Sequence, residues 1–154
     1  GPPHGDRLRG RVADESVIWN AHPERGMLSS LQLGAAAALR AEASHLMVAL
    51  VDHPHVRIET LRALLEACKG SGSSLVRPRY RGRRGHPWIA DAALLRRILA
   101  LSLDVPEGVR TAFRGLDSEL ELELDDPAIL EDLDTLEELR RAGFEPEVPG
   151  GGFP

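Results

Sequence analysis

The distribution of apolar residues along the chain predicts an alternation of strands and helices. Short runs that are continuously apolar or strictly alternating indicate strands, whereas apolar positions three and four residues apart indicate helices. The segments with a strand pattern are 17–20, 46–51, 75–80 and 119–124, with a second short strand or bend at 129–134. The segments with a helix pattern are 29–42, 58–69, 92–101, 109–114 and 136–142. This order predicts a layered α/β sheet with at least one antiparallel strand.

Two of these strands have more specific patterns. Residues 46–51 read LMVALV, a continuous apolar run that is typical of a strand buried on both faces of a parallel sheet. Residues 119–124 read ELELEL, and this alternation predicts one packed face and one wet face. Polar residues mark the helix starts, since Ser29 or Ser30 is expected to cap the first helix and Thr135 the last.

Length and composition bound the class of protein. The chain has 154 residues, of which 42% are hydrophobic and 28% charged, values of an ordinary globular protein. Its length suits one domain and is too short for two ordinary ones, so we expect a single domain over 1–154 with loosely ordered tails at 1–15 and 145–154. The one cysteine, Cys68, excludes an internal disulfide and is expected to be a small buried residue.

The sequence also argues against some partners. No apolar run approaches the roughly 18 residues of a membrane-spanning helix, and the start of the chain does not resemble a signal peptide. A cytoplasmic protein without membrane contact is therefore expected. The net charge of −5 hides an asymmetry, because 115–147 carries 13 acidic residues against two arginines. Since nucleic-acid binders normally have an overall basic balance, we expect no nucleic-acid partner.

Basic charge is concentrated in one short segment. Its five arginines are Arg77, Arg79, Arg81, Arg83 and Arg84. Gly82, Gly85 and Pro87 interrupt the segment and disfavour a helix, so we expect an exposed loop. Guanidinium groups match the geometry of phosphate with paired donors, and glycines allow the backbone to approach a ligand closely. The loop therefore suits an anionic ligand, and a solvated basic loop that binds nothing is the alternative.

Acidic residues follow two of the expected strands. Asp52 ends the apolar run 46–51, at the edge where open α/β sheets place their ligands. Asp132 and Asp134 lie near the end of the later segment and would point to one face if extended. Carboxylates at such places can share Mg²⁺, a cation that prefers oxygen ligands and bridges to substrate phosphates. The alternative is that these residues are helix caps and surface acids.

Four short motifs occur in order along most of the chain. They are GMLSSLQLG at 26–34, ALVDHP at 49–54, PRYRGRRGHP at 78–87 and EDLDTLEEL at 131–139. Together they resemble the corresponding motifs of the MobA-like nucleotidyltransferases, in particular those of the molybdenum-cofactor cytidylyltransferase branch. The most specific of the four is the P-x-Y-x-G-x-R-G-H-P pattern.

This resemblance implies a fold and a reaction. The fold would be a three-layer α/β/α, Rossmann-like nucleotidyltransferase domain with a mostly parallel sheet. The enzyme would use Mg²⁺ to transfer CMP or GMP from CTP or GTP to a phosphorylated acceptor such as molybdopterin, with release of pyrophosphate. A sugar phosphate is an alternative acceptor.

The same resemblance implies roles for individual residues. Asp52 matches a strand-end metal aspartate, and Asp132 or Asp134 would complete the metal site. The residues implied as catalytic are Asp52, Arg81, Arg84 and His86, with Arg83 as a further acceptor contact. The residues implied in cofactor or nucleotide binding are Asn20, Gly26, Ser29, Ser30, Gly82 and Gly85.

Two features depart from the family pattern. Val51 and His53 flank Asp52, where the family has a glycine and an amide or small residue. Residues 1–16 contain no glycine-rich A-G-x-S-x-R-M-G-x-x-K loop for the triphosphate, so the resemblance implies a partial, N-terminally truncated domain with a sheet open at its centre. An enzyme that transfers nucleotides poorly by itself and a non-catalytic acceptor-binding or partner module both stay open. Unpaired strand edges also predict homo-oligomers.

Overall fold

The structure, a computed structural model, describes residues 17–145. The tails that the sequence suggests are loosely ordered, 1–15 and 145–154, lie outside the described residues except for Glu145. In chain order the elements are η3 (Pro23–Arg25), α1 (Met27–Arg40), β1 (His45–Val48), α2 (Ile58–Ser71), β2 (Leu75–Tyr80), β3 (Arg83–Arg84), β4 (Trp88–Asp91), α3 (Ala92–Leu99), α4 (Arg110–Phe113), β5 (Glu119–Glu123), η4 (Pro127–Leu130) and α5 (Leu136–Arg141).

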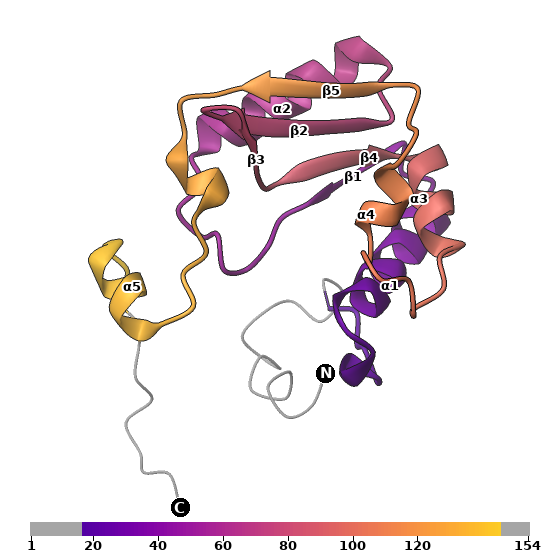
Figure 1. Cartoon of the computed structure of the whole chain (residues 1–154), viewed down its shortest axis with the longest axis horizontal. Coiled ribbons are helices and arrows are strands. Elements are labelled where there is room, and N and C mark those ends of the chain that lie inside the picture. The colour runs from indigo at the N-terminus through magenta and orange to yellow at the C-terminus, as the bar shows by residue number, and fades with distance from the viewer. Residues whose placement is uncertain (1–16, 146–154) are drawn as a thin grey trace, which may run out of the picture.

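The strands form one five-stranded mixed sheet with β2 near its centre (Figure 1). β4 runs antiparallel to both of its neighbours, β1 and β2, whereas β5 pairs with β2 in parallel. β3 adds a two-residue ladder at the end of β2. The α/β class and the antiparallel strand that the sequence predicts are confirmed. β1, β2 and β5 point in the same direction, but only β2 and β5 are hydrogen-bonded as parallel neighbours.

Helices cover both faces of this sheet and make it a three-layer structure (Figure 1). Leu75 and Ala90 pack with α1, α3 and α4 on one face, while Val76 and Ile89 pack with α2 on the other. Neighbouring residues of a strand point to opposite faces, so β2 and β4 each supply side chains to two cores. None of the helices within 17–145 is both long and apolar enough to cross a membrane.

The segment 17–20, which the sequence suggests is a strand, forms no regular element. Its last residue, Asn20, is buried and donates hydrogen bonds to the hydroxyls of Ser29 and Ser30 at 3.0 and 2.8 Å. The prediction that one of these serines caps α1 is wrong, because the N-cap is Gly26 and makes no side-chain cap. The hydroxyl of Ser29 instead donates to the carbonyl of Gly26.

β1 is shorter and more exposed than the pattern of 46–51 predicts. It ends at Val48, pairs antiparallel with β4 and has no second strand partner among the described residues. Its side chains are exposed or half-buried, and Val51 beyond it is 96% exposed. The prediction of a strand buried on both faces of a parallel sheet is wrong, because β1 forms an edge of the described sheet.

The arginine segment is a β-hairpin rather than the expected loop. Arg77 and Arg79 belong to β2, and Arg83 pairs with Tyr80 across a two-residue turn. The backbone φ angles in the turn are 50° at Arg81 and 77° at the following glycine. A two-residue hairpin turn with both φ angles positive matches the twist of the flanking strands and favours glycine. The geometry of the turn therefore explains the glycine at position 82 without any ligand.

One buried carboxylate, Asp126, joins α2 to η4. It is 2% exposed and accepts hydrogen bonds from the hydroxyl of Thr60, at 2.6 Å, and from the backbone N–H groups of Arg57 and Ala128. The guanidinium of Arg57 lies 3.5 Å away. Together with Pro127 in the first turn, this cap starts a 3₁₀ helix where the sequence suggested a strand or a bend beginning at residue 129.

Removal of this carboxylate should destabilise the fold. Burial by itself would raise the pKa of Asp126, but the bonds from Thr60, Arg57 and Ala128 and the charge of Arg57 hold the pKa below its ordinary value. We expect Asp126→Asn to lower the free energy of unfolding by roughly 2–4 kcal/mol, because an amide cannot replace a carboxylate that accepts several bonds. Urea denaturation at pH 7 measures the loss.

The pH dependence gives a second readout of the same carboxylate. Because its folded-state pKa is below the unfolded value of about 3.9, its stabilisation is present above that pH and is lost as the pH falls through the folded-state pKa. The difference in the free energy of unfolding between the parent protein and Asp126→Asn should therefore shrink in strong acid. A difference that stays constant down to pH 2 would contradict the assignment.

Candidate functional site

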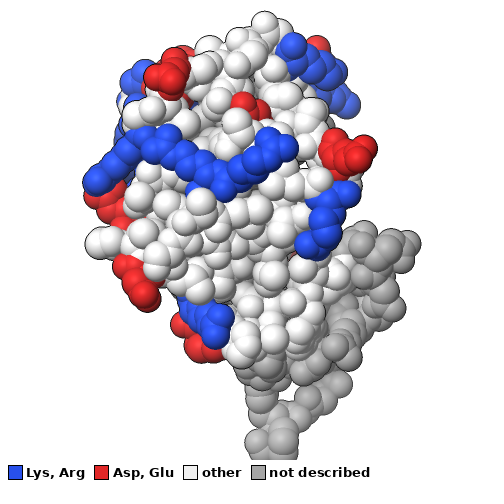
Figure 2. Space-filling view, turned by 90° about the vertical axis from the view of Figure 1, so that its right-hand side faces the viewer, with Lys and Arg blue, Asp and Glu red and all other residues white. Residues whose placement is uncertain are grey.

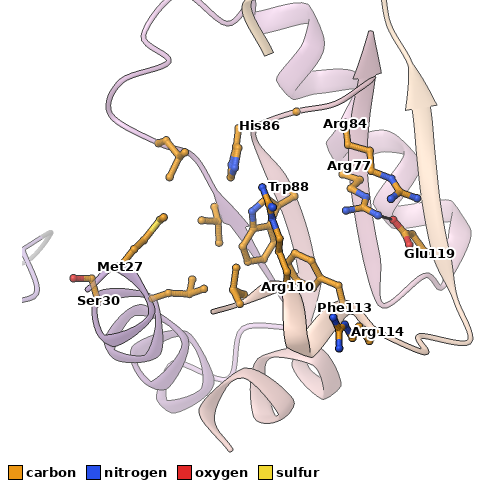
Figure 3. Close-up of a pocket in the computed structure, with 15 residues that line it drawn as sticks. Met27, Ser30, Arg77, Arg84, His86, Trp88, Arg110, Phe113, Arg114 and Glu119 are labelled. Atoms are coloured by element: carbon orange, nitrogen blue, oxygen red, sulfur yellow. Dashed lines mark ion pairs between the residues drawn. The ribbon is translucent and has the colours of Figure 1, made fainter. Parts of the chain in front are cut away.

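A cavity of about 740 Å³ opens between α1, the end of β1, the β2–β3 hairpin and α4. Figure 3 shows Met27 and Ser30 of α1 on one side and Arg77, Arg84 and Glu119 on the other. The residues that line it are Met27, Ser30, Leu31, Val48, Leu50, Arg77, Arg84, Gly85, His86, Trp88, Val109, Arg110, Phe113, Arg114 and Glu119. The cavity thus collects side chains from seven separate elements, α1, β1, β2, β3, β4, α4 and β5.

The cavity combines an aromatic floor with positive charge. The rings of Trp88 and Phe113 meet edge to face with centroids 5.2 Å apart. Its charged lining residues are Arg77, Arg84, Arg110 and Arg114, against one acid, Glu119. Such a lining can bind a flat ring that carries an anionic group, because aromatic faces stack on rings and guanidinium groups pair with phosphate or carboxylate.

β5 supplies partners for the arginines of the hairpin. The parallel register places Glu121 opposite Arg77 and Glu123 opposite Arg79. The ion pairs that result are Arg77–Glu119, Arg77–Glu121, Arg79–Glu121, Arg79–Glu123 and Arg84–Glu121. The face of β5 that the sequence predicts to be wet is therefore covered by arginine side chains.

Glu121 is the centre of this ladder. Burial alone would raise the pKa of its carboxyl group, but the hydrogen bond and charge of Arg84, with the charges of Arg77 and Arg79, hold the pKa below its ordinary value. Arg77 and Arg84 are thereby held in fixed directions at the wall of the cavity. Arg110, by contrast, makes no ion pair within residues 17–145 and is exposed, so its charge is free for a ligand.

His86 lies where the cavity meets the segment after β1. Its backbone N–H donates to the carbonyl of Ile129 in η4 at 2.9 Å, and the N–H of Gly85 donates to Pro78. Burial is the main cause that lowers the pKa of His86. The Nδ1 of its ring is buried without a hydrogen-bond partner.

Gly85 is required by the close approach of this turn to η4. A Cβ at this position would lie 2.2 Å from the carbonyl oxygen of Ile129, far inside contact distance. The glycine that the resemblance implied as a ligand contact thus also lets His86 reach the backbone of η4. Both roles are compatible, since Gly85 lines the cavity as well.

Asp52 and His53 lie beyond His86. The rings of His53 and His86 have centroids 5.6 Å apart, and His53 Nε2 is 4.0 Å from Asp52 Oδ1. That carboxylate oxygen is buried and has no hydrogen-bond partner. The backbone carbonyl of Asp52 accepts a bond of 2.8 Å from the N–H of Leu133, which brings the segment between Asp132 and Asp134 beside it.

The structure therefore brings together only part of the predicted site. Ser30, Arg84, Gly85 and His86 line the cavity, and His86 connects it to Asp52 through His53. The residues that do not line it are Asn20, Gly26, Ser29, Asp52, Arg81, Gly82, Arg83, Asp132 and Asp134. Within residues 17–145, no group of three or more histidine, cysteine, aspartate and glutamate side chains gathers as a metal site.

Several of the excluded residues have other contacts. Asn20 and Ser29 bond to each other, and Arg81 places its guanidinium 5.0 Å from the ring of Tyr80. Sequence reasoning missed Arg110 and Arg114, although a spacing of four within the helix predicted at 109–114 would put them on one face. In the structure α4 ends at Phe113, and both arginines line the cavity. No local pattern marked Trp88 as the cavity floor.

Figure 2 shows the face that carries α3 and α4. Basic side chains cross it in a narrow band, and most of the remaining surface is uncharged, with acidic groups mainly toward the margins. This distribution differs from the broad basic surface that duplex nucleic acid requires.

Comparison with known proteins identifies relatives of the chain. A profile of the MobA-like NTP transferase domain matches residues 4–122. Nicotine blue oxidoreductase from Paenarthrobacter nicotinovorans is 33% identical over 140 residues, which cover 86% of this chain and 67% of that protein.

Solved structures share the fold. A crystal structure of Rv0371c from Mycobacterium tuberculosis superposes with a TM-score of 0.67 at 24% identity, covering 90% of this chain and 70% of that one. Its manganese complex gives 0.66 at 25% identity, over 90% and 72%. Molybdopterin-guanine dinucleotide biosynthesis protein A from Archaeoglobus fulgidus gives 0.63 at 19% identity, over 90% and 71%. The resemblance read from the motifs is confirmed for the family.

The contact of Gly85 with η4 generates a stability prediction. We expect Gly85→Ala to lower the free energy of unfolding by about 2 kcal/mol or more, because the added methyl group overlaps backbone that cannot rotate away. Gly34→Ala is the matched control, since Gly34 lies within α1 with no atom near its Cβ position. The control should be neutral or more stable by roughly 0.5–1 kcal/mol. Equal effects of the two changes in urea denaturation would contradict this account.

Proposed function

Because the chain belongs to the MobA-like NTP transferase domain family, we propose that it takes part in nucleotidyl transfer. The proposed reaction moves CMP or GMP from CTP or GTP to a phosphorylated acceptor such as molybdopterin and releases pyrophosphate. The observation that carries the proposal is the cationic, aromatic-floored cavity that adjoins the buried, unpartnered oxygen of Asp52. Cytoplasm is the proposed location, since nucleoside triphosphates are available there.

The cavity is proposed to bind the acceptor. Its aromatic floor at Trp88 and Phe113 suits a fused ring, and the guanidinium of Arg110 suits the phosphate. His86 extends the cavity toward Asp52 through its contact with His53. A phosphate bound here would therefore lie near the edge where the transfer is proposed to occur.

A divalent cation is proposed at Asp52. The fit rests on the carboxylate oxygen that is buried and lacks a partner, since such an oxygen is costly unless a donor or a cation satisfies it. When bound, the cation would offset the charge of the phosphates. Asp132 and Asp134 are proposed as additional ligands because their segment bonds to the backbone of Asp52.

The nucleotide is proposed to contact the start of α1 and the hairpin. Ser30 and Gly85 line the cavity and Gly26 lines a second hollow that adjoins it, so these three are the better-placed members of the implied set. The remaining proposed members are Asn20, Ser29 and Gly82. Arg81 remains proposed as an acceptor contact from the tip of the hairpin.

A second candidate function is an oxidoreductase, because a relative that is 33% identical has that name. In that case the same aromatic floor would bind a ring that is reduced or oxidised. A third is an acceptor-binding module without catalysis. Assays of both reactions separate these candidates: pyrophosphate release from CTP or GTP with molybdopterin, and decolourisation of nicotine blue with a reduced dinucleotide as electron donor. Acceptor binding with neither reaction would favour the module.

Asp52→Asn tests the proposed metal site. We expect it to remove cation-dependent binding of CTP or GTP, because the amide lacks the charge that holds the cation, while the melting temperature stays close to that of the parent protein. Isothermal titration with and without Mg²⁺ measures the effect. Unchanged cation-dependent binding would remove Asp52 from the site.

Arg110→Ala tests the acceptor site. We expect it to weaken binding of a pterin monophosphate about tenfold to a hundredfold, since each bond to a charged group contributes roughly 1.5–3 kcal/mol. Arg62→Ala is the control, because Arg62 is exposed on α2 at the opposite face of the sheet. An equal loss in both variants would point to general charge rather than to the cavity.

A further inference from the structure

His53 occupies an unusual position beside Asp52. Its side chain is only 9% exposed, although it belongs to an irregular segment between β1 and α2. It is enclosed by the backbone of η4 at Ala128 and by the ring of His86. A histidine buried in this way needs partners for both ring nitrogens, because an unsatisfied buried polar group is costly.

Only one of these nitrogens has an evident partner. His53 Nδ1 lies 3.2 Å from the carbonyl oxygen of Ala128. A carbonyl can only accept, so Nδ1 carries the hydrogen, and in the neutral ring Nε2 then presents its lone pair. The atom that faces this lone pair is Asp52 Oδ1, at 4.0 Å. Two electron-pair donors therefore face each other with no hydrogen between them.

A cation between the two atoms would satisfy both. Divalent ions bind imidazole nitrogen and carboxylate oxygen at about 2.0–2.2 Å, so two ligands of one ion lie at most about 4.4 Å apart. The observed separation is within this limit. The bond from Nδ1 to a backbone carbonyl is also the usual arrangement behind a metal-bound histidine, since it fixes the tautomer and the ring direction.

A direct ion pair between a charged His53 and Asp52 is the alternative. The separation of 4.0 Å argues against it, because a charged N–H would be drawn to about 2.7–2.9 Å from the oxygen. A direct pair would also give the buried Oδ1 a hydrogen bond, and this oxygen has none.

We propose that His53 Nε2 and Asp52 Oδ1 bind one divalent cation together, and that the imidazole makes the site prefer Mn²⁺ to Mg²⁺. Imidazole nitrogen is a good ligand for first-row transition ions, whereas Mg²⁺ keeps oxygen ligands and water. The remaining coordination positions belong to water and substrate oxygens. This inference deepens the proposed function, on which it rests for the use of the cation, but it concerns binding that needs no substrate.

Electron paramagnetic resonance of bound Mn²⁺ tests the proposal directly. The protein is titrated with Mn²⁺ without nucleotide, and spin-echo envelope modulation then detects a nitrogen-14 nucleus coupled to the ion. Competition with Mg²⁺ gives the ratio of the two affinities. The variants are His53→Gln and, as matched control, His55→Gln, two residues away in the same segment with its Nε2 3.2 Å from Glu131. Melting curves establish that each variant is folded.

The expected result is a nitrogen coupling in the parent protein and in His55→Gln. In His53→Gln the coupling disappears, the Mn²⁺ affinity falls about tenfold, and the Mg²⁺ affinity changes much less. Coupling that persists in His53→Gln, or equal loss of affinity for both ions, would overturn the proposal. Mn²⁺ bound through oxygen alone in the parent protein would overturn it as well.

The outcomes separate this inference from the proposed function. If pyrophosphate release is absent but the nitrogen coupling is present and depends on His53, the proposed metal site is supported and the proposal of nucleotidyl transfer is rejected. If transfer occurs and His53→Gln leaves the metal preference unchanged, the proposal of nucleotidyl transfer is supported and the role of His53 is rejected.

Discussion

The contact between η4 and the turn after β3 is the constraint on which the candidate site depends. Asp126 holds η4 against the start of α2 through bonds from Thr60 and from the backbone at Arg57 and Ala128. The carbonyl groups of η4 then accept from the backbone of His86 and from the ring of His53. One buried carboxylate thus fixes the directions of both histidines, and the absence of a side chain at Gly85 allows the approach.

The arginines divide into two groups with different physical roles. Arg77, Arg79 and Arg84 of the hairpin are paired with the glutamates of β5, so much of their charge is neutralised within the protein. An ion pair reduces the conformational freedom of a side chain and fixes its direction. A side chain with a fixed direction suits the wall of a binding cavity. Arg110 comes from α4, on the other wall, and lacks such a partner among the described residues. Its charge is therefore available to an anionic ligand.

The geometry links two kinds of chemistry through His86. On one side lies a cavity with aromatic and cationic walls, and on the other a carboxylate oxygen without a hydrogen-bond partner beside the imidazole of His53. Nucleotidyl transfer needs this combination, since a cation and basic side chains must act on neighbouring phosphates. A redox reaction would use the aromatic floor without requiring the carboxylate. The role of Asp52 therefore separates the two proposed functions physically.

The sequence by itself determined the class of fold, the helices and the strands β1, β2 and β5, because apolar periodicity reflects which side of an element is buried. It did not predict β3 or β4, and it suggested strands at 17–20 and 129–134 where none forms. Through one resemblance it also predicted functional roles for Asp52, Arg84, Gly85 and His86, of which the last three line one cavity. It wrongly predicted a strand buried in a parallel sheet at 46–51, because a continuous apolar run does not reveal how many neighbouring strands pair with it.

Only the tertiary structure decided which charges are free. The ELELEL pattern of β5 and the arginines of β2 were both visible, but their pairing depends on a parallel register between segments about 40 residues apart. The same holds for Asp126 and for the position of His53 beside Asp52, which arise from contacts between η4 and distant segments. Local sequence patterns predict whether a residue is buried, but long-range packing decides which residues it contacts. The chemistry of this site depends on those contacts.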